Sequence, residues 1–383
     1  MYMIPIQSKL PGVATTIFTV MSKLAAEHNA INLSQGFPDF DCDPELVTYV
    51  AEAMKDGHNQ YAPMAGTAAL RNAISAKNEL LYGATYDPET EITVTAGGTQ
   101  AIFTALAATI NIGDEVIIFE PAYDCYSPTV KLLGGLVKPF GLAPPEYEID
   151  WNMVKKLFSV NTKMIILNSP QNPTGRTLKE KDIQELIKLT KNTDILILSD
   201  EVYEHIIFDG EKHLSVSKYP ELRERSFVIA SFGKLLHATG WKVGYCLAPE
   251  YLMKEFRKVH QFNVFSVNTP MQVGIAKYLS DPARYMELAG FFQQKRDLFR
   301  GLLRETKFKL LPCNGSYFQC VTYNEIGDLS DKDMAIRLVE EFGVASVPVS
   351  AFYIRNTDHQ VLRFCFAKKQ ETLEKAVERL MKI

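Results

Sequence analysis

The sequence lacks the cysteine patterns, signal segment and long apolar runs that mark secreted, zinc-binding and membrane-spanning proteins. Its six cysteines are scattered, with neither a C-x-x-C pair nor a zinc-ligand spacing, which favours reduced, mostly buried thiols. The N-terminus has no apolar core of the secretory type, and no apolar run reaches the roughly 18 residues needed to span a bilayer. We therefore expect a cytoplasmic protein without a metal site or a membrane segment.

The sequence also lacks an excess of positive charge. Its formal net charge is −4, with both signs interspersed, so there is no electrostatic basis for binding nucleic acid or an anionic membrane. No G-x-G-x-x-G follows a predicted strand, and no G-x-x-x-x-G-K-[ST] occurs. These two absences argue against a nicotinamide dehydrogenase and a P-loop nucleotide enzyme.

What the sequence does contain, from about residue 90, is an alternation of strand and helix patterns. Several predicted strands are continuous apolar runs, as expected for parallel strands buried on both faces. The predicted strands are residues 91–96, 115–120, 136–140, 164–168, 195–199, 227–231 and 244–248. Helical patterns lie between them, for example at 99–110 and 180–191. We predict an α/β fold with a mostly parallel seven-stranded sheet flanked by helices.

Past about residue 270 the pattern changes to one typical of a smaller α+β domain. Helices are predicted at 270–279, 285–303, 331–342 and 370–381, and short strands at 316–322 and 362–366. A helix is also predicted at 16–28, in an N-terminal arm. The expected division is an arm with part of the small domain at 1–45, a large domain at 46–275 and a small C-terminal domain at 276–383.

Residues that could perform chemistry follow the predicted strands. Ligands of open α/β sheets bind at the carboxyl ends of the strands, and Lys234 and Asp200 both stand at such ends. A lysine amine can form a Schiff base with an aldehyde cofactor, and a carboxylate can keep a pyridine nitrogen protonated. Taken singly, each has a more ordinary interpretation, because a lysine there is usually solvated and an aspartate is usually a helix cap.

Two further strand ends carry related signals. Gly98 and Thr99 follow the strand at 91–96 and begin a helix, where backbone N–H groups can bind a phosphate, although many α/β turns contain glycines. Asn172 follows the strand at 164–168 and could be a neutral donor to a ring oxygen or simply a turn residue. The functional interpretation rests on the set, because four strand ends of one sheet each supply a part of the same site.

With these residues in place, the chain resembles the class I/II aminotransferases of pyridoxal phosphate fold type I over essentially its whole length. Within that family it is most similar to the methionine aminotransferase and kynurenine/glutamine transaminase subgroup. The stretches that carry the resemblance are residues 32–40, 59–63, 119–126, 199–205 and 363–366. The resemblance implies pyridoxal 5′-phosphate as the cofactor and a homodimer with shared active sites.

The resemblance also implies roles around the cofactor ring. Lys234 would form the imine and then move the proton, and Asp200 would pair with the pyridine nitrogen. Asn172 and Tyr203 would bond to the ring oxygen, and Tyr123 would stack on the ring. The catalytic residues implied are Lys234, Asp200 and Tyr203.

The phosphate and the substrate have implied ligands as well. The phosphate would be held by Gly98, Thr99, Ser231 and Lys242, and by Tyr61 across the dimer interface. The substrate site would comprise Gly36, Arg363, Asn172, Tyr61 and Phe18. Arg363 makes chemical sense as the carboxylate ligand, because a guanidinium fork matches a carboxylate in two parallel hydrogen bonds. Phe18 would line the side-chain pocket.

The implied function is the transfer of an amino group from a medium or large uncharged L-amino acid to a 2-oxo acid. The donors considered are methionine, glutamine, an aromatic amino acid or kynurenine. Two positions leave the side-chain preference open, because relatives often carry an aromatic residue at Ala122 and some carry tryptophan at Phe18. The alternatives are a cysteine-conjugate β-lyase or a cyclising synthase on the same scaffold, and a non-catalytic regulator.

Overall fold

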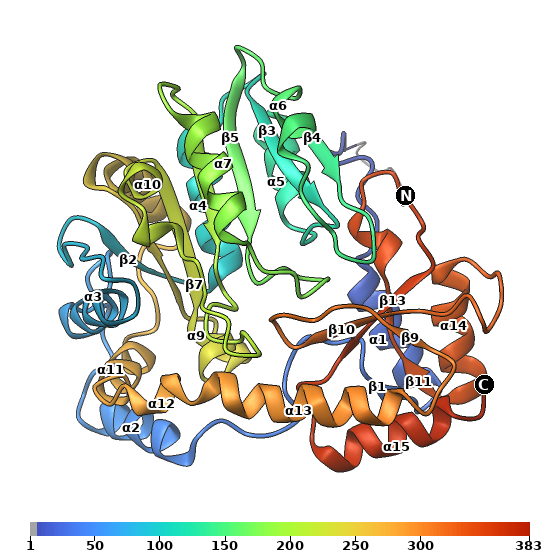
Figure 1. The fold of residues 1–383 in the computed structure, drawn as a ribbon. Helices are drawn as coiled ribbons and strands as arrows, with labels where there is room; N and C mark the ends of the chain where they lie inside the picture. Colours follow the sequence, from blue (N-terminus) through green and yellow to red (C-terminus); the bar gives the residue numbers. More distant parts are fainter. Residues whose placement is uncertain (1–5) are drawn as a thin grey trace, which may run out of the picture.

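A computed structural model describes residues 6–383 of the chain, so the first five residues of the predicted arm lie outside the described residues. All seven predicted strands of the large sheet are present, in the order β2-β8-β7-β6-β5-β3-β4 (Figure 1). Their bounds are β2 (Ile92–Thr95), β3 (Glu115–Glu120), β4 (Leu136–Gly141), β5 (Thr162–Asn168), β6 (Leu196–Asp200), β7 (Ser226–Ser231) and β8 (Gly244–Leu247). The sheet is parallel except for β8, which runs antiparallel to both β2 and β7.

Helices cover both faces of this sheet because its strands are apolar on both sides. In β7, Phe227 and Ile229 pack in one apolar cluster, whereas the alternating residues Val228 and Ala230 pack in another. The first cluster contains side chains from α4 (Gly98–Thr109) and α10 (Glu250–Asn263), and the second contains side chains from helices α3 and α7. The other helices of this part are α2 (Pro44–Lys55), α3 (Ala68–Tyr82), α5 (Tyr126–Leu132), α6 (Trp151–Lys155), α7 (Glu180–Thr190), α8 (Pro220–Arg223), α9 (Phe232–Leu235), α11 (Thr269–Tyr278) and α12 (Ala283–Met286).

A second, four-stranded sheet with the order β12-β13-β10-β9 forms the C-terminal part. Its elements are α13 (Leu288–Leu303), β9 (Lys309–Leu310), β10 (Phe318–Thr322), α14 (Asp331–Phe342), β11 (Val344–Ala345), β12 (Val347–Pro348), β13 (Val361–Cys365) and α15 (Gln370–Leu380). The N-terminal helix α1 (Ile17–Glu27) packs on α14, and β1 (Ile31–Asn32) pairs in parallel with β11. The N-terminal elements α1 and β1 therefore lie with the C-terminal elements of the chain in this part (Figure 1). The domain limits at residues 45 and 275 stay a prediction.

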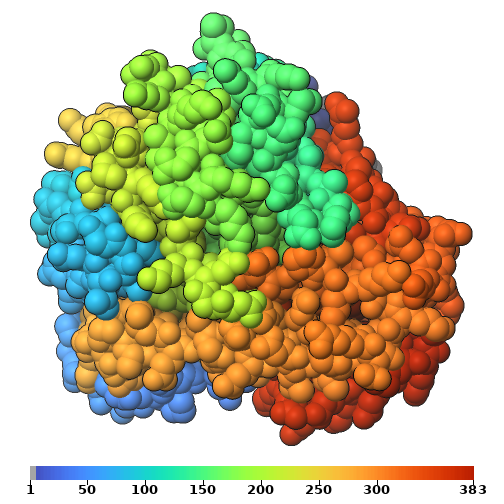
Figure 2. All heavy atoms as spheres, in the orientation of Figure 1, coloured from blue at the N-terminus to red at the C-terminus, as the bar shows by residue number. Residues whose placement is uncertain are grey.

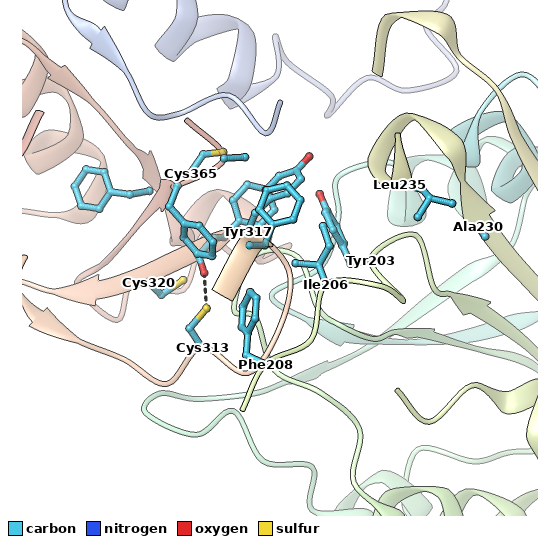
Figure 3. Packing of buried hydrophobic residues seen from close by; sticks show 14 of the residues in the cluster. Tyr203, Ile206, Phe208, Ala230, Leu235, Cys313, Tyr317, Cys320 and Cys365 are labelled. Atoms are coloured by element: carbon cyan, nitrogen blue, oxygen red, sulfur yellow. Dashed lines mark hydrogen bonds between the residues drawn. The ribbon is translucent and has the colours of Figure 1, made fainter. Parts of the chain in front are cut away.

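One apolar core continues from the large sheet into the C-terminal part. Figure 3 shows Tyr203, Ile206 and Phe208, which follow β6, packed near Cys313, Tyr317 and Cys320 of the C-terminal part. Along the surface, the orange atoms around α13 form a band that runs across the face of the molecule from one part to the other (Figure 2). Side chains from both parts pack together in this core and so fix how the two sheets lie relative to each other. Within residues 6–383, no helix is long and apolar enough to cross a membrane.

A buried ion pair ties α3 to the segment that follows β6. The Lys77 ammonium lies 2.7 Å from the Glu204 carboxylate and donates to the Tyr245 hydroxyl at 3.0 Å. The side chains of Lys77 and Glu204 are only 2% and 8% exposed. Burial alone would raise the pKa of Glu204, but the charge of Lys77 together with the hydrogen bonds from Lys77 and Tyr82 outweighs burial and holds that pKa at about 2.

We predict that Lys77→Met destabilises the protein by about 3–5 kcal/mol, because it leaves the Glu204 carboxylate buried without a counter-charge. Urea unfolding at pH 7 measures this loss. Because the pKa of Glu204 is depressed in the fold, its contribution is complete above pH 4.5 and disappears as the pH falls toward 2. The control is Lys258→Met in the exposed pair with Glu255, which should cost less than about 1 kcal/mol. Equal losses for the two variants would contradict the argument.

Candidate active site

A cavity of about 290 Å³ lies at the carboxyl ends of the large-sheet strands, where the C-terminal part meets them. Twelve of the thirteen predicted site residues line it. They are Phe18, Gly36, Gly98, Thr99, Tyr123, Asn172, Asp200, Tyr203, Ser231, Lys234, Lys242 and Arg363. The large sheet supplies most of them through the turns after β2, β5, β6 and β7, whereas β13 supplies Arg363 and α1 supplies Phe18.

Lys234 lies in the one-turn helix α9, directly after β7. Its ammonium donates to the Tyr317 hydroxyl oxygen at 2.7 Å and to the Gly36 carbonyl at 2.9 Å. Burial lowers the pKa of Lys234 to about 8, and the nearby charges of Arg363 and Lys242 act in the same direction. The amine is therefore not an ordinary solvated lysine, and a useful fraction of it is neutral and nucleophilic near physiological pH.

The Asp200 carboxylate ends β6 and is almost fully buried. The Tyr126 hydroxyl donates to its Oδ2 at 2.5 Å, and the Val202 N–H donates to its Oδ1 at 3.2 Å. Burial raises the pKa of Asp200 to about 6 in spite of these two hydrogen bonds. Among the described residues it has no ion-pair partner within 4.0 Å. The carboxylate is thus suited to a cationic ligand group in the cavity.

Another part of the cavity lining is suited to an anion. Helix α4 starts after Gly97, whose φ of +82° favours glycine, and no side chain caps its first N–H groups. A Cβ placed on Gly97 would lie 3.4 Å from the Lys242 ammonium nitrogen. Ser231 lines the same cavity, and the Thr99 and Tyr123 hydroxyls are hydrogen-bonded at 3.3 Å. Free backbone donors beside an ammonium are the usual elements of a phosphate site.

The Arg363 guanidinium is completely buried on the C-terminal side of the cavity. It donates to Asn172 Oδ1 at 2.7 Å and to the Ser34 carbonyl at 2.8 Å, while its Nε has no partner. The Phe318 ring lies 3.9 Å from the guanidinium carbon. No carboxylate of the described part of the chain pairs with Arg363. Asn172 thus binds Arg363 through its side chain rather than acting only as a turn residue, and the guanidinium retains a donor for a ligand carboxylate.

Tyr61 is the predicted site residue that does not line the cavity. It is 82% exposed, and its ring packs edge-on against Phe265 at a centroid distance of 5.3 Å. A single copy of the chain does not bring Tyr61 to the other site residues. Its predicted role across a dimer interface stays a prediction.

Several residues of the site were missed by the sequence reasoning. Asn168 donates to the Asp200 backbone carbonyl at 3.0 Å and ends β5, so the strand-end rule could have found it. Tyr126 stands in the quoted stretch 119–126, but nothing local indicates its contact with Asp200. Tyr317 comes from the segment before β10 and reaches Lys234 only through the packing of the two sheets. Within residues 6–383, no group of three or more His, Cys, Asp or Glu side chains is placed to hold a metal ion.

Comparison with known proteins places this geometry in a family. The sequence model of the family described as aminotransferase class I and II matches residues 28–380. A methionine aminotransferase of Escherichia coli strain K12 is 47% identical over 378 residues, covering 98% of each chain. Kynurenine–oxoglutarate transaminase 1 of Rattus norvegicus is 32% identical, covering 98% of this chain and 97% of its own. The crystal structure of YbdL from Escherichia coli, identified with a methionine aminotransferase function, matches with a TM-score of 0.97 at 47% identity over 100% of both chains.

We predict that Lys234 reacts with aldehydes at lower pH than the exposed lysines do, because its pKa lies at about 8. The amine must be neutral to attack, so its reaction rate should rise with pH and level off above pH 8. Reductive methylation of the protein free of cofactor, followed by peptide mass spectrometry, measures this rate. The methylation rate of the exposed lysines should level off about two pH units higher. Lys234→Arg should lose the part of the reaction that levels off above pH 8. A midpoint above pH 10 for Lys234 would contradict the burial argument.

Proposed function

The chain belongs to the class I and II aminotransferase family, and from that premise we propose its substrate class, its cofactor and the roles of its residues. It moves the amino group of a medium or large uncharged L-amino acid to a 2-oxo acid, with pyridoxal 5′-phosphate as the cofactor. The observation that supports this best is the gathering of Lys234, Asp200 and Arg363 around one cavity, each without an ion-pair partner within residues 6–383.

The residues of the cavity fit pyridoxal phosphate in charge and in chemistry. The unpaired Asp200 carboxylate suits a protonated pyridine nitrogen, and the uncapped start of α4 with Lys242 suits the phosphate. Ser231, Thr99 and the backbone of Gly98 would complete the phosphate ligands. Asn172 and Tyr203 would bond to the ring oxygen, and Tyr123 would stack on the ring.

The proposed mechanism assigns one task to each charged side chain. Pyridoxal phosphate, when bound, supplies an aldehyde for amine capture and a ring that accepts the electron pair left when the substrate Cα–H bond breaks. The Lys234 amine would hold the cofactor, and in its neutral form it would be the general base that takes the substrate Cα proton. The Asp200 carboxylate would pair with the pyridine nitrogen. Arg363 binds the substrate carboxylate and so orients the Cα–H bond toward Lys234.

The cavity itself favours an uncharged substrate side chain. Its cations are Lys234, Lys242 and Arg363, and each already has a task. A second carboxylate on the substrate would therefore find no free cation among the described residues. The cavity lining beside Arg363 is instead aromatic, because Phe18 packs edge-on against Phe352 at 5.7 Å and Phe318 lines the same cavity. The resemblance to a methionine aminotransferase and to kynurenine transaminases supports the same substrate class.

A homodimer in the cytoplasm completes the proposal. Tyr61 packs against Phe265, which is 41% exposed, and Phe262, three residues earlier in the sequence, is 91% exposed. An exposed aromatic group of this kind is typical of an interface, and a second copy seated on it could bring Tyr61 to a phosphate. The β-lyase alternative is not favoured by the relatives, which are named transaminases. A non-catalytic regulator is not favoured either, since Lys234 and Asp200 are both present in the cavity.

We predict that methionine, glutamine and aromatic amino acids convert the cofactor to its amine form much faster than aspartate does, because aspartate lacks a cation for its second carboxylate. The visible absorption band of the purified holoenzyme, followed after adding one amino acid without a 2-oxo acid, measures each half-reaction. The band should return when a 2-oxo acid is added. Faster conversion by aspartate would refute the substrate class, and release of pyruvate and ammonia from cysteine conjugates alone would favour the lyase.

We predict that Arg363→Lys lowers kcat/KM for methionine by about 30- to 4000-fold, because loss of a buried charge-assisted contact costs about 2–5 kcal/mol and an ammonium cannot replace the guanidinium fork. Steady-state kinetics of the holoenzyme measures the loss, while cofactor absorbance should stay unchanged. Arg337→Lys, in an exposed pair with Glu341, is the matched control and should behave as the wild type. A loss of cofactor with unchanged kcat/KM per bound cofactor would remove Arg363 from the substrate site.

A further inference from the structure

The Tyr317 hydroxyl lies between the reacting amine of Lys234 and the backbone of the N-terminal segment. It accepts a hydrogen bond from Lys234 Nζ at 2.7 Å and donates one to the Gly36 carbonyl at 2.5 Å. The same carbonyl accepts a second hydrogen bond from Lys234 Nζ at 2.9 Å. We propose that Tyr317 is a positioning residue that, together with Gly36, holds the released lysine amine with its lone pair toward the substrate. The inference rests on the proposed function, because it concerns the base in that reaction.

The geometry matters because a neutral amine has only two N–H donors and one lone pair. The Tyr317 oxygen and the Gly36 carbonyl use both donors, so the lone pair is left for the third direction, away from these two acceptors. Lys234 lines the cavity, and that direction is available to a substrate Cα–H bond. With only one acceptor, the amine would rotate about its terminal bond and present its lone pair for a smaller fraction of the time.

Both acceptors are held rigidly by their surroundings. The Tyr317 ring is 1% exposed and packs against Tyr203 at 5.1 Å and Phe318 at 4.9 Å between ring centroids (Figure 3). The Gly36 segment is fixed by Asn32, whose Oδ1 accepts from the Ser34 N–H at 3.0 Å and from the Ser34 hydroxyl at 2.7 Å. The two acceptors come from distant parts of the sequence, so their placement on one nitrogen depends on the packed fold.

Other ionisable groups surround Lys234 without taking over this role. In the described part of the chain, Tyr317 and Gly36 provide the hydrogen-bond acceptors of Nζ. The groups that act on Lys234 by charge are Asp200 from β6, Lys242 before β8, and Arg363 and Cys365 from β13. The Tyr203 ring lies 5.5 Å from Nζ and presents its face rather than an acceptor. Removing the Tyr317 hydroxyl therefore leaves the surrounding charges in place and removes one acceptor.

The test is Tyr317→Phe, assayed by capture of pyridoxal phosphate by the protein freed of cofactor. Borohydride makes the attachment to Lys234 permanent, and the rate of attachment is measured as a function of pH. An acceptor stabilises the ammonium more than the neutral amine, so its loss should lower the midpoint by about one pH unit. The plateau rate should fall about tenfold because the amine is less well oriented. In the reloaded enzyme, kcat for methionine should fall while KM stays unchanged.

Tyr323→Phe is the matched control, because it removes another buried phenol whose hydroxyl donates to a backbone carbonyl, that of Leu329 at 2.8 Å. It should leave the midpoint and the plateau unchanged. Far-UV circular dichroism of Tyr317→Phe guards against misfolding, because this substitution keeps the ring that packs against Tyr203 and Phe318. A wild-type midpoint and plateau in folded Tyr317→Phe, or the same changes in Tyr323→Phe, would overturn the inference. No capture at Lys234 in the wild type would instead overturn the proposed function.

Discussion

The removal of charged groups from water without ion-pair partners is the constraint on which this structure depends. Burial lowers the pKa of Lys234 to about 8 and raises that of Asp200 to about 6. Relative to exposed groups, keeping each of them charged at pH 7 costs the fold roughly 3 kcal/mol. Lys77 and Glu204 differ from these groups, because their two buried and opposite charges form an ion pair. The fold therefore tolerates unpaired charges around the cavity, whereas it pairs the buried charges of Lys77 and Glu204.

The apolar core that joins the two sheets holds these unpaired charged groups in place. The strand ends of the large sheet bring Asp200 and Lys234 together, but Arg363, Gly36 and Tyr317 belong to the C-terminal part and the N-terminal segment. The packing of Tyr203 against Tyr317 and Phe318 keeps these two sets in register. A cavity formed between two packed sheets can hold its groups in place before a ligand arrives, which is what positioned catalysis requires.

The sequence predicted the parts of this site that local rules can reach. The alternation of strand and helix patterns predicted all seven strands of the large sheet. The strand-end rule located Gly98, Asn172, Asp200 and Lys234, because parallel strands bring their carboxyl ends to one edge. Arg363 and Phe18 entered only through the family resemblance, since nothing local places β13 or α1 beside that edge. Tyr317 was missed for the same reason. The predicted helix at 285–303 was also only partly right, since the structure divides it into α12 and α13.

Burial raises the pKa of Asp200 and lowers the pKa of Lys234. Binding of the proposed cofactor would therefore be coupled to the ionisation of these two groups. In the cavity the acid is a weaker acid and the lysine is a weaker base than either would be in water. A pyridinium beside Asp200 would lower that pKa again and recover part of the free energy lost on burial. The fold thus places charged groups of both signs around one cavity, and a single zwitterionic ligand would match them. Part of the free energy of binding such a ligand would come from relieving the cost of burying Asp200 without a counter-charge.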